Sequence, residues 1–136
     1  MRLLKLLIWL IPASIWSQNR LEVHVSGVET STGVIQVALF NSDSGFLKSD
    51  GAYRLSSVNA QKGTTRVIME NLPSGHYALA VFHDLNSNEK LDTNWIGIPK
   101  EPMGFSNSRV KAFGPPGFEE CRLELVRDMA ITVNLE

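Results

Sequence analysis

Short runs in which apolar and polar residues alternate constrain this chain more than any other feature of its sequence. In the run 21–28, Leu21, Val23 and Val25 fall on one face and polar residues fall between them. A period of two residues is typical of a half-buried β-strand, and no stretch shows a convincing helical period. The runs expected to form strands are 21–28, 34–40, 53–60, 64–70, 77–82, 122–126 and 130–135.

Turn-forming residues separate these runs. Gly, Pro, Asn and Ser cluster between them, as at 30–33, 72–75 and 114–117. About seven short strands with such turns predict an all-β protein, a single antiparallel β-sandwich that is immunoglobulin-like or transthyretin-like. The first two runs face each other across a short turn ending in Gly33, which predicts a hairpin. The run 77–82 is apolar on both faces and should lie in the middle of a sheet.

The N-terminus has the pattern of a secretory signal peptide. Arg2 and Lys5 precede an apolar run at 6–15 that is short for a membrane span, and Ser17 is a plausible last residue before cleavage. We therefore expect a signal peptide at 1–17 and a domain at 18–136, periplasmic or secreted. An uncleaved N-terminal anchor is the alternative.

Charge and chain length limit the function classes. The expected cleavage removes two of the 13 cationic residues and none of the 14 acidic ones, and eleven against fourteen leaves a formal charge of −3. A mildly acidic chain without a basic block is a poor nucleic-acid binder. We expect no nucleic-acid partner, no membrane-spanning segment after cleavage, and a monomer.

A long irregular segment, 83–120, follows the most apolar run. Loops of this length in a compact domain are usually functional or disordered, and this segment holds too many apolar residues for a disordered linker. We expect it to be ordered and packed against the sandwich. The single cysteine, Cys121, follows it and alternates with Leu123 and Leu125, which predicts a buried thiol on the apolar face of a strand. A nucleophile or an intermolecular disulfide are the alternatives.

Oxygen-bearing side chains gather at the start of this segment. Asp84, Asn86, Asn88 and Asp92 occupy relative positions 1, 3, 5 and 9, as in the first part of an EF-hand calcium loop, and Lys90 at position 7 would add its carbonyl. Position 6 lacks the usual Gly and position 12 lacks the usual Glu, so this loop would need further oxygens, such as those of Glu101 or Asn94. The alternative is a polar loop whose Asp and Asn side chains cap their own backbone turns.

Two other uses of the segment are open. In a hydrolase, Ser106 would be the nucleophile and His83 the base, with Asp92 or Asp128 orienting it, although no Gly-x-Ser-x-Gly motif is present.

In a binding protein, aromatic and cationic side chains would line a surface for a small molecule, glycan or peptide. The residues expected there are Trp95, Lys100 and Phe105, with Phe113 and Arg109. The alternative is that these aromatic rings close the open edge of the core beneath the long loop.

Two family resemblances rest on particular motifs. The string LPSGHY at 72–77 resembles the strand–turn–strand signature of carboxypeptidase-regulatory-like and collagen-adhesin B-type sandwiches. The strings GVIQVALFN at 33–41 and HDLNSNEKLDTN at 83–94 resemble the uncharacterised bacterial domain-of-unknown-function family 2141. Where that family commonly shows Asp-Glu-Asn-Gly-Asn-Gly, residues 84–89 lack both glycines.

The second resemblance implies an exported sandwich-like domain. Together with the residues above, it leads us to expect a non-catalytic exported module that binds a ligand or an envelope protein or has a structural role, with calcium as its only candidate cofactor. The alternative is a periplasmic hydrolase or small-ligand-binding protein that uses His83, Asp84, Asp92 and Ser106.

Overall fold

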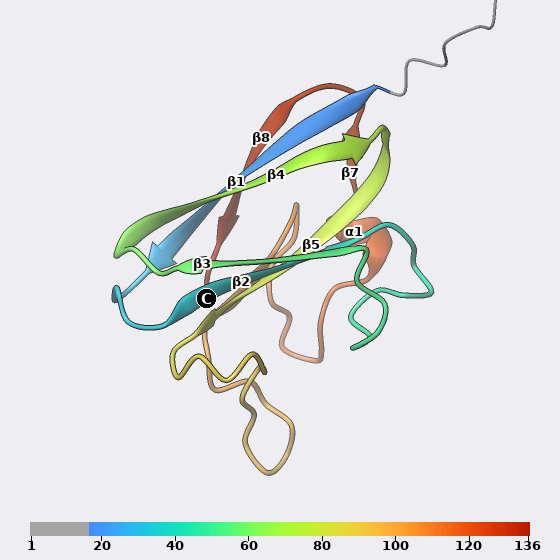
Figure 1. Ribbon diagram of the computed structural model, residues 1–136. Coiled ribbons are helices and arrows are strands. Elements are labelled where there is room, and N and C mark those ends of the chain that lie inside the picture. The colour runs from blue at the N-terminus through green and yellow to red at the C-terminus, as the bar shows by residue number, and fades with distance from the viewer. Residues whose placement is uncertain (1–16) are drawn as a thin grey trace, which may run out of the picture.

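The computed structural model describes residues 17–136, so the predicted signal peptide lies, apart from Ser17, outside the described residues (Figure 1). Strands dominate the chain and one helical turn interrupts them. The elements are β1 (Gln18–Val28), β2 (Val34–Phe40), β3 (Arg54–Asn59), β4 (Gly63–Pro73), β5 (Gly75–Asp84), β6 (Met103–Phe105), α1 (Phe118–Cys121), β7 (Leu123–Leu125) and β8 (Met129–Asn134).

These strands form two sheets that pack face to face, which confirms the predicted β-sandwich. One sheet has the order β4-β1-β8, and the other has the order β3-β2-β5-β6, with β7 also paired to β5. Neighbouring strands run antiparallel except β1 and β8, which pair in parallel from Leu21 opposite Met129 to Ser26 opposite Asn134. The short strand β6 was not expected from the sequence, and its three residues are too few to show a period.

The predicted hairpin between the first two runs is wrong. β1 pairs with β4 and β8, whereas β2 pairs with β3 and β5, so the turn before Gly33 carries the chain from one sheet to the other. Alternation shows that each run has one buried face. It does not show whether two successive runs lie side by side or face to face, and both arrangements bury the same residues.

The central position predicted for the run 77–82 is confirmed, because β5 pairs with β2, β6 and β7. Its inner face joins the main core between the sheets, where Leu79 and Val81 meet Leu21 and Val23. The turn that leads into it is capped by Tyr77, whose hydroxyl donates to the carbonyl oxygen of Pro73 at 2.7 Å.

A second, smaller apolar cluster covers part of the outer face of the five-stranded sheet. Phe118 and Cys121 of α1 are buried there with Phe40 and Ala78. The ring of Phe46, from the loop after β2, packs edge-to-face against Phe40 with centroids 5.2 Å apart. This cluster explains why β5 is apolar on both faces.

Cys121 is buried, as predicted, but it ends α1 and does not belong to a strand. No local pattern predicted α1, because a single helical turn has no measurable period. Burial, aided by the nearby charge of Glu120, raises the pKa of the Cys121 thiol to about 11.

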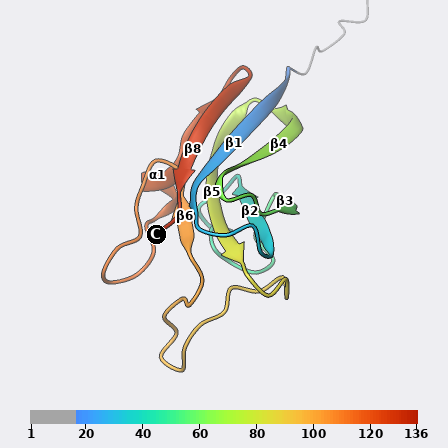
Figure 2. The same ribbon diagram turned by 90° about the vertical axis from the view of Figure 1, so that its left-hand side faces the viewer.

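The segment 83–120 is an ordered run of turns and short elements. It returns to the sandwich at β6, where Met103 and Glu136 exchange backbone hydrogen bonds of 3.2 and 2.9 Å. Between β5 and β6 the chain leaves the body of the protein, and both views show this loop projecting beyond the ends of the two sheets (Figures 1 and 2).

Candidate functional site

The projecting loop begins at Asp84, the last residue of β5, whose carboxylate is fully buried. Its Oδ1 accepts a hydrogen bond from the backbone N–H of Asn88 at 3.1 Å. Its Oδ2 accepts one from the backbone N–H of Glu89 at 2.8 Å and one from Gln36 Nε2 at 3.2 Å. Burial pushes the pKa of Asp84 up, but the donors from Glu89, Gln36 and Asn88 outweigh it and the pKa lies below its ordinary value. Asp84 is therefore ionised, and the first turn of the loop curves around its carboxylate so that backbone N–H groups can donate to it.

The other three side chains of the predicted calcium set lie together on the exposed side of this loop. Asp92 Oδ2 accepts a hydrogen bond from Asn86 Nδ2 at 2.6 Å, and Asp92 Oδ1 accepts one from Asn88 Nδ2 at 2.9 Å. Asn86 Oδ1 in turn accepts from the backbone N–H of Asn88 at 3.2 Å. The side chains of Asn86, Asn88 and Asp92 are thus linked to one another, and Asp84 is joined to them through the backbone N–H of Asn88.

Lys90 lies in the same turn with its backbone N–H donating to Asn88 Oδ1 at 3.0 Å. This contact, like the one between Asn86 and Asn88, spans two residues and is a local Asx turn. The alternative expected from the sequence, in which the polar side chains cap their own backbone, therefore describes much of the loop.

Glu101 braces the loop from its far end. This carboxylate is 6% exposed; its Oε1 accepts from the backbone N–H of Leu85 and its Oε2 from that of Asp92, each at 3.0 Å. From the sequence, Glu101 was expected only as an additional oxygen for a cation. Its spacing from Asp84 carries no local pattern that would have indicated this bracing role.

Two residues of the loop adopt backbone angles that favour glycine. Ser87 has φ 55° and Glu89 has φ 63°, both in the left-handed region. These are the two positions at which the resembling family commonly shows glycine. The loop therefore keeps its tight turns without glycine, since the contacts around Asp84 hold the backbone in place.

The fit of this loop to a calcium ion can be judged from its oxygens. A carboxylate offers about four lone-pair positions, and the three donors on Asp84 leave one of them, on Oδ1. The amide groups of Asn86 and Asn88 present N–H to Asp92, and a half-turn of each amide would present oxygen instead. Within residues 17–136 no group of three or more His, Cys, Asp or Glu side chains is placed to hold a metal ion. The residues fit a weak oxygen site with two carboxylates and two amides.

A small hairpin, defined here as the tip hairpin (residues 93–99), projects beyond this loop. Thr93 and Pro99 form an antiparallel bridge. Asn94 organises the turn, because its Oδ1 accepts from the backbone N–H groups of Ile96 and Ile98 at 3.0 and 2.9 Å. The tip hairpin is ordered although it lies outside the sandwich.

The residues proposed for a ligand surface do not lie together. Trp95 is 95% exposed on the tip hairpin and Phe113 is fully exposed on a different loop, whereas Phe105 is 2% exposed in β6 and belongs to the second apolar cluster. The alternative prediction, that these aromatic rings are buried against the core, is therefore right for Phe105 and wrong for Trp95 and Phe113. Lys100 is exposed at the base of the tip hairpin, so among Trp95, Lys100 and Phe105 only Trp95 and Lys100 lie near each other along the chain.

The hydrolase set is not assembled. Ser106 is fully buried, donates to the carbonyl oxygen of Cys121 at 2.6 Å and accepts from the backbone N–H of Leu79 at 2.9 Å. His83 is also buried and contacts the carbonyl oxygen of Thr32 through Nε2 at 2.6 Å. Ser106 sits beside Leu79, which is four residues from His83 along β5, or roughly 13 Å at the rise of a strand. The two groups are too far apart for a nucleophile and its base.

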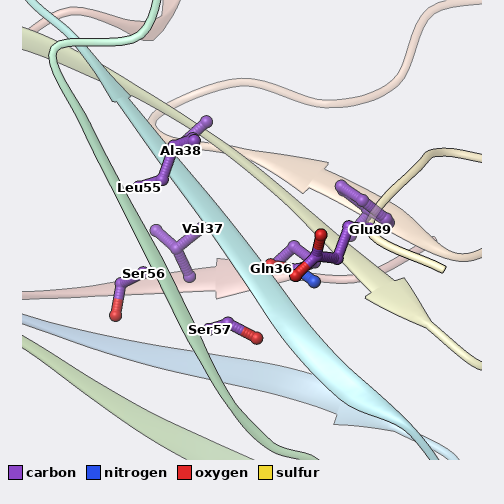
Figure 3. Close-up of a pocket in the computed structure, with 8 residues that line it drawn as sticks. Gln36, Val37, Ala38, Leu55, Ser56, Ser57 and Glu89 are labelled. Carbon is purple, nitrogen blue, oxygen red and sulfur yellow. The ribbon is translucent and has the colours of Figure 1, made fainter. Parts of the chain in front are cut away.

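An open groove lies over the uncovered part of the five-stranded sheet, and sequence reasoning missed it. Its volume is about 380 Å³, and none of Trp95, Lys100 and Phe105 lines it. Gln36 and Glu89 lie at one end and Ala38 and Leu55 at the other (Figure 3). Ala38 and Leu55 come from different strands. The pairing of β2 with β3, which sets Ala38 opposite Leu55, brings them together, and the sequence does not reveal this pairing.

Comparison with known proteins gives one match. A family model described as "Uncharacterized protein conserved in bacteria (DUF2141)" matches residues 23–133. No curated protein and no solved structure matches the chain. The resemblance of the turn at 72–77 to carboxypeptidase-regulatory-like domains therefore stays a prediction. Among residues 17–136, no helix has the length and apolar character needed to span a bilayer.

Proposed function

The chain belongs to the DUF2141 family, and because the description of that family names no activity, we propose a function from the geometry of the projecting loop. The protein is an exported, non-catalytic binding module in which calcium organises the loop at 84–94 and so holds the tip hairpin in place. Export rests on the signal-peptide pattern of residues 1–17.

The observation that carries this proposal is the convergence of four oxygen-bearing side chains. Asp84, Asn86, Asn88 and Asp92 come from one turn: the amides of Asn86 and Asn88 both donate to Asp92, and Asp84 Oδ1 accepts from the backbone N–H of Asn88. Calcium prefers carboxylate, amide and carbonyl oxygens, and six to eight of them. Asp84 Oδ1, Asp92, the two amide oxygens and the carbonyl of Lys90 would hold the ion, and water would complete the shell.

The charge of the set supports weak binding. Two carboxylates give a formal charge of −2, and the lowered pKa of Asp84 keeps that group ionised at neutral pH. Extracellular calcium modules of low ligand charge bind with a Kd of about 10⁻⁴ to 10⁻³ M. A bound ion would replace the amide contacts to Asp92 as the link between the two ends of the loop.

A non-catalytic role is supported by the state of the candidate nucleophiles. The hydroxyl of Ser106 and the thiol of Cys121 are both fully buried. Neither group lines the groove: Cys121 ends α1, and Ser106 donates to the carbonyl oxygen of Cys121. We therefore assign no reaction to these residues.

Thermal unfolding with calcium tests the proposal. Ten millimolar calcium, which is about 10 to 100 times the expected Kd, should stabilise the protein by about 1.4–2.7 kcal/mol and raise the Tm by several degrees. EDTA should reverse the shift, and magnesium at the same concentration should give a smaller one because it seldom uses an all-protein cage. No calcium-dependent shift would refute the calcium site.

Three variants sharpen the test. Asp92→Ala should abolish the calcium shift, whereas Asp50→Ala, a change in an exposed loop away from the site, should leave it intact. Asn86→Asp adds a third carboxylate and should enlarge the shift. An equal shift in all three variants would mean that calcium acts elsewhere.

A further inference from the structure

We propose that β3 accepts an extended segment of a partner protein as an added antiparallel strand, and that a basic side chain of this segment pairs with Glu89 across the open groove. This inference rests on the proposed function, that of a binding module, and names the kind of partner and the surface that receives it.

β3 is an edge strand whose outer backbone groups are unpaired. It ends the five-stranded sheet on one side, and among the described strands it pairs with β2 alone (Figure 2). The N–H of Ala60 donates to the carbonyl oxygen of Gly33 at 3.1 Å in the same register, so every second residue back from Ala60 points its backbone groups toward β2. The backbone groups of Leu55, Ser57 and Asn59 therefore point away from the sheet, and within residues 17–136 none of them has a hydrogen-bond partner.

β3 also lacks the features that keep edge strands from pairing. Exposed charges and Pro on an edge strand oppose the addition of another strand. β4, at the edge of the other sheet, exposes Arg66 and Glu70 and ends at Pro73. The one charged residue of β3 is Arg54, and its guanidinium donates to the carbonyl oxygen of Glu70 in the other sheet. The edge of β3 at 55–59 is thus open to another strand.

The open groove continues this edge onto the outer face of the sheet. Leu55 and Ser57 line it together with Ala38 and Gln36, which lie opposite them on β2 (Figure 3). Residues directly opposite each other in paired strands point to the same face, so an added strand places every second side chain beside Leu55 and Ser57. Main-chain hydrogen bonds and a site for alternate side chains are the two components of recognition by strand addition.

Charge selects a basic side chain for the segment. Of the described residues, Glu89 is the only charged one that lines the groove, and its carboxylate takes part in no ion pair among them. The carboxylate of Asp84, also an anion, accepts from Gln36 at the same end of the groove. A Lys or Arg opposite Ser57 would lie roughly 10 Å from β2, at two strand spacings, and would extend over the groove toward Glu89.

A second copy of this chain is the competing occupant of the edge. Pairing β3 with itself brings no cation to Glu89, because Arg54 is already bound to the carbonyl oxygen of Glu70 in its own copy. A separate extended segment that carries Lys or Arg therefore fits the edge and the groove better than a second β3.

Amide signals in NMR spectra of the form that starts at Gln18, which retains every described strand, test the proposal. The probe is the acetylated and amidated peptide Thr-Lys-Thr-Val-Thr-Val-Thr, whose Lys and Val side chains share one face when it is extended. At millimolar peptide, the N–H signals of Leu55, Ser57 and Asn59 should shift and their hydrogen exchange should slow several-fold. The N–H of Ser56 points toward β2 and should be protected already in the free protein. Unchanged signals at 55, 57 and 59 would overturn the proposal.

A modified peptide separates backbone pairing from other contacts. The backbone N–H groups of its Lys and Val residues face β3 in the added strand. Methylation of these nitrogens removes the donors and should abolish the signal shifts. Shifts that survive methylation would rule out strand addition.

Sedimentation of the free protein tests the competing occupant. The proposal expects a monomer whose spectrum does not depend on protein concentration. A dimer whose formation shifts the signals of Leu55, Ser57 and Asn59 would assign the edge to a second copy and overturn the proposal.

Two variants at one position test the edge. Ser57→Pro removes an outward N–H and places a ring at the edge, so the affinity for the peptide should fall about tenfold or more. Ser57→Ala is the matched control, because it keeps the N–H and should bind the peptide as the wild type does. Equal loss in both variants would refute pairing through the backbone. The thermal unfolding curve of each variant checks that the sandwich is intact.

Electrostatics gives an independent arm. Glu89→Gln should reduce the affinity for the peptide several-fold, and it should leave unchanged the weaker affinity for a peptide with Gln in place of Lys. Glu124→Gln, at an exposed position on β7, is the control and should have no effect on either peptide. An equal loss with both peptides in Glu89→Gln would overturn the assignment of a basic side chain.

Calcium and the peptide are tested separately. Peptide binding is measured in EDTA and again in calcium. A calcium-dependent Tm shift without peptide binding would overturn strand addition and leave the proposed calcium site standing. Peptide binding without a calcium-dependent Tm shift would support strand addition and refute the calcium site.

Discussion

Glu101 Oε2 accepts a hydrogen bond from the backbone N–H of Asp92 at 3.0 Å, while its other oxygen accepts from the N–H of Leu85 at the same distance. One buried carboxylate thus joins the start and the end of the projecting loop. Asp84 likewise accepts from two backbone N–H groups, those of Asn88 and Glu89, within the first turn of the loop. The loop is therefore held by two anions that bind backbone donors, and its exposed side chains are free for other contacts.

Glu101→Ala should loosen the loop. The substitution leaves two backbone donors without their charged acceptor, and hydrogen bonds to charged groups are worth about 1.5–3 kcal/mol. Limited digestion with trypsin, which cuts after Lys90 and Lys100, should become several-fold faster, and the free energy of unfolding should fall by about 2 kcal/mol. The control is Glu29→Ala, at an exposed loop position. Unchanged digestion would contradict the bracing role of Glu101.

Asp84→Asn should destabilise the protein at neutral pH by about 1.5–3 kcal/mol, because the amide cannot replace an anion that accepts three hydrogen bonds. The pKa of Asp84 is lower in the folded state than its ordinary 3.8. Its contribution to stability is therefore fully present above about pH 4 and is lost as the pH falls through the folded-state pKa.

The difference in unfolding free energy between the wild type and Asp84→Asn should accordingly shrink below about pH 4. Urea unfolding at neutral and acidic pH measures it. Asp50→Asn, at an exposed position, is the control. A difference that stays constant down to the folded-state pKa would show that ionisation of Asp84 does not contribute to stability.

Glycine at either left-handed position should stabilise the protein. Ser87→Gly and Glu89→Gly remove the cost of a side chain at φ 55° and 63°. The gain is partly offset by the greater freedom of glycine in the unfolded chain, so we expect about 0.5–1 kcal/mol for each and a rise in Tm of a few degrees. Lys90→Gly, at a position without a positive φ, should destabilise instead. Destabilisation by all three changes would contradict the assigned strain.

Ser106→Ala tests whether this hydroxyl is structural. Its removal leaves the N–H of Leu79 and the carbonyl oxygen of Cys121 without a buried partner, which should cost about 1–3 kcal/mol in urea unfolding. Ser49→Ala, at an exposed position, should cost much less. A neutral Ser106→Ala would mean that water replaces the hydroxyl.

Cys121 should be inert in the folded protein. Its thiol is fully buried and its pKa is raised to about 11, so thiolate is scarce at neutral pH. A disulfide reagent added at pH 7 should react slowly with native protein and quickly after unfolding in urea. Equal rates in the two states would contradict this prediction and favour the alternatives, a reactive cysteine or an intermolecular disulfide.

Several features of the fold followed from local sequence patterns. The alternation in the run 21–28 predicted β1, and the apolar character of both faces of the run 77–82 predicted a central strand. These features are predictable because the period of side-chain direction belongs to the strand itself. The partner of each strand was not predictable, as the wrong hairpin between β1 and β2 shows, because alternation carries no record of what lies opposite.

The same distinction between predictable and unpredictable features applies to the projecting loop. The sequence by itself determined that oxygen-bearing side chains would recur at 84, 86, 88 and 92, and that local Asx turns would follow. Only the tertiary structure decided that Asp84 and Glu101 turn inward to backbone donors, and that Phe105 is covered while Trp95 is exposed. The spacing of side chains along a strand or turn is set by neighbouring residues, whereas burial depends on which distant segments the fold brings over them.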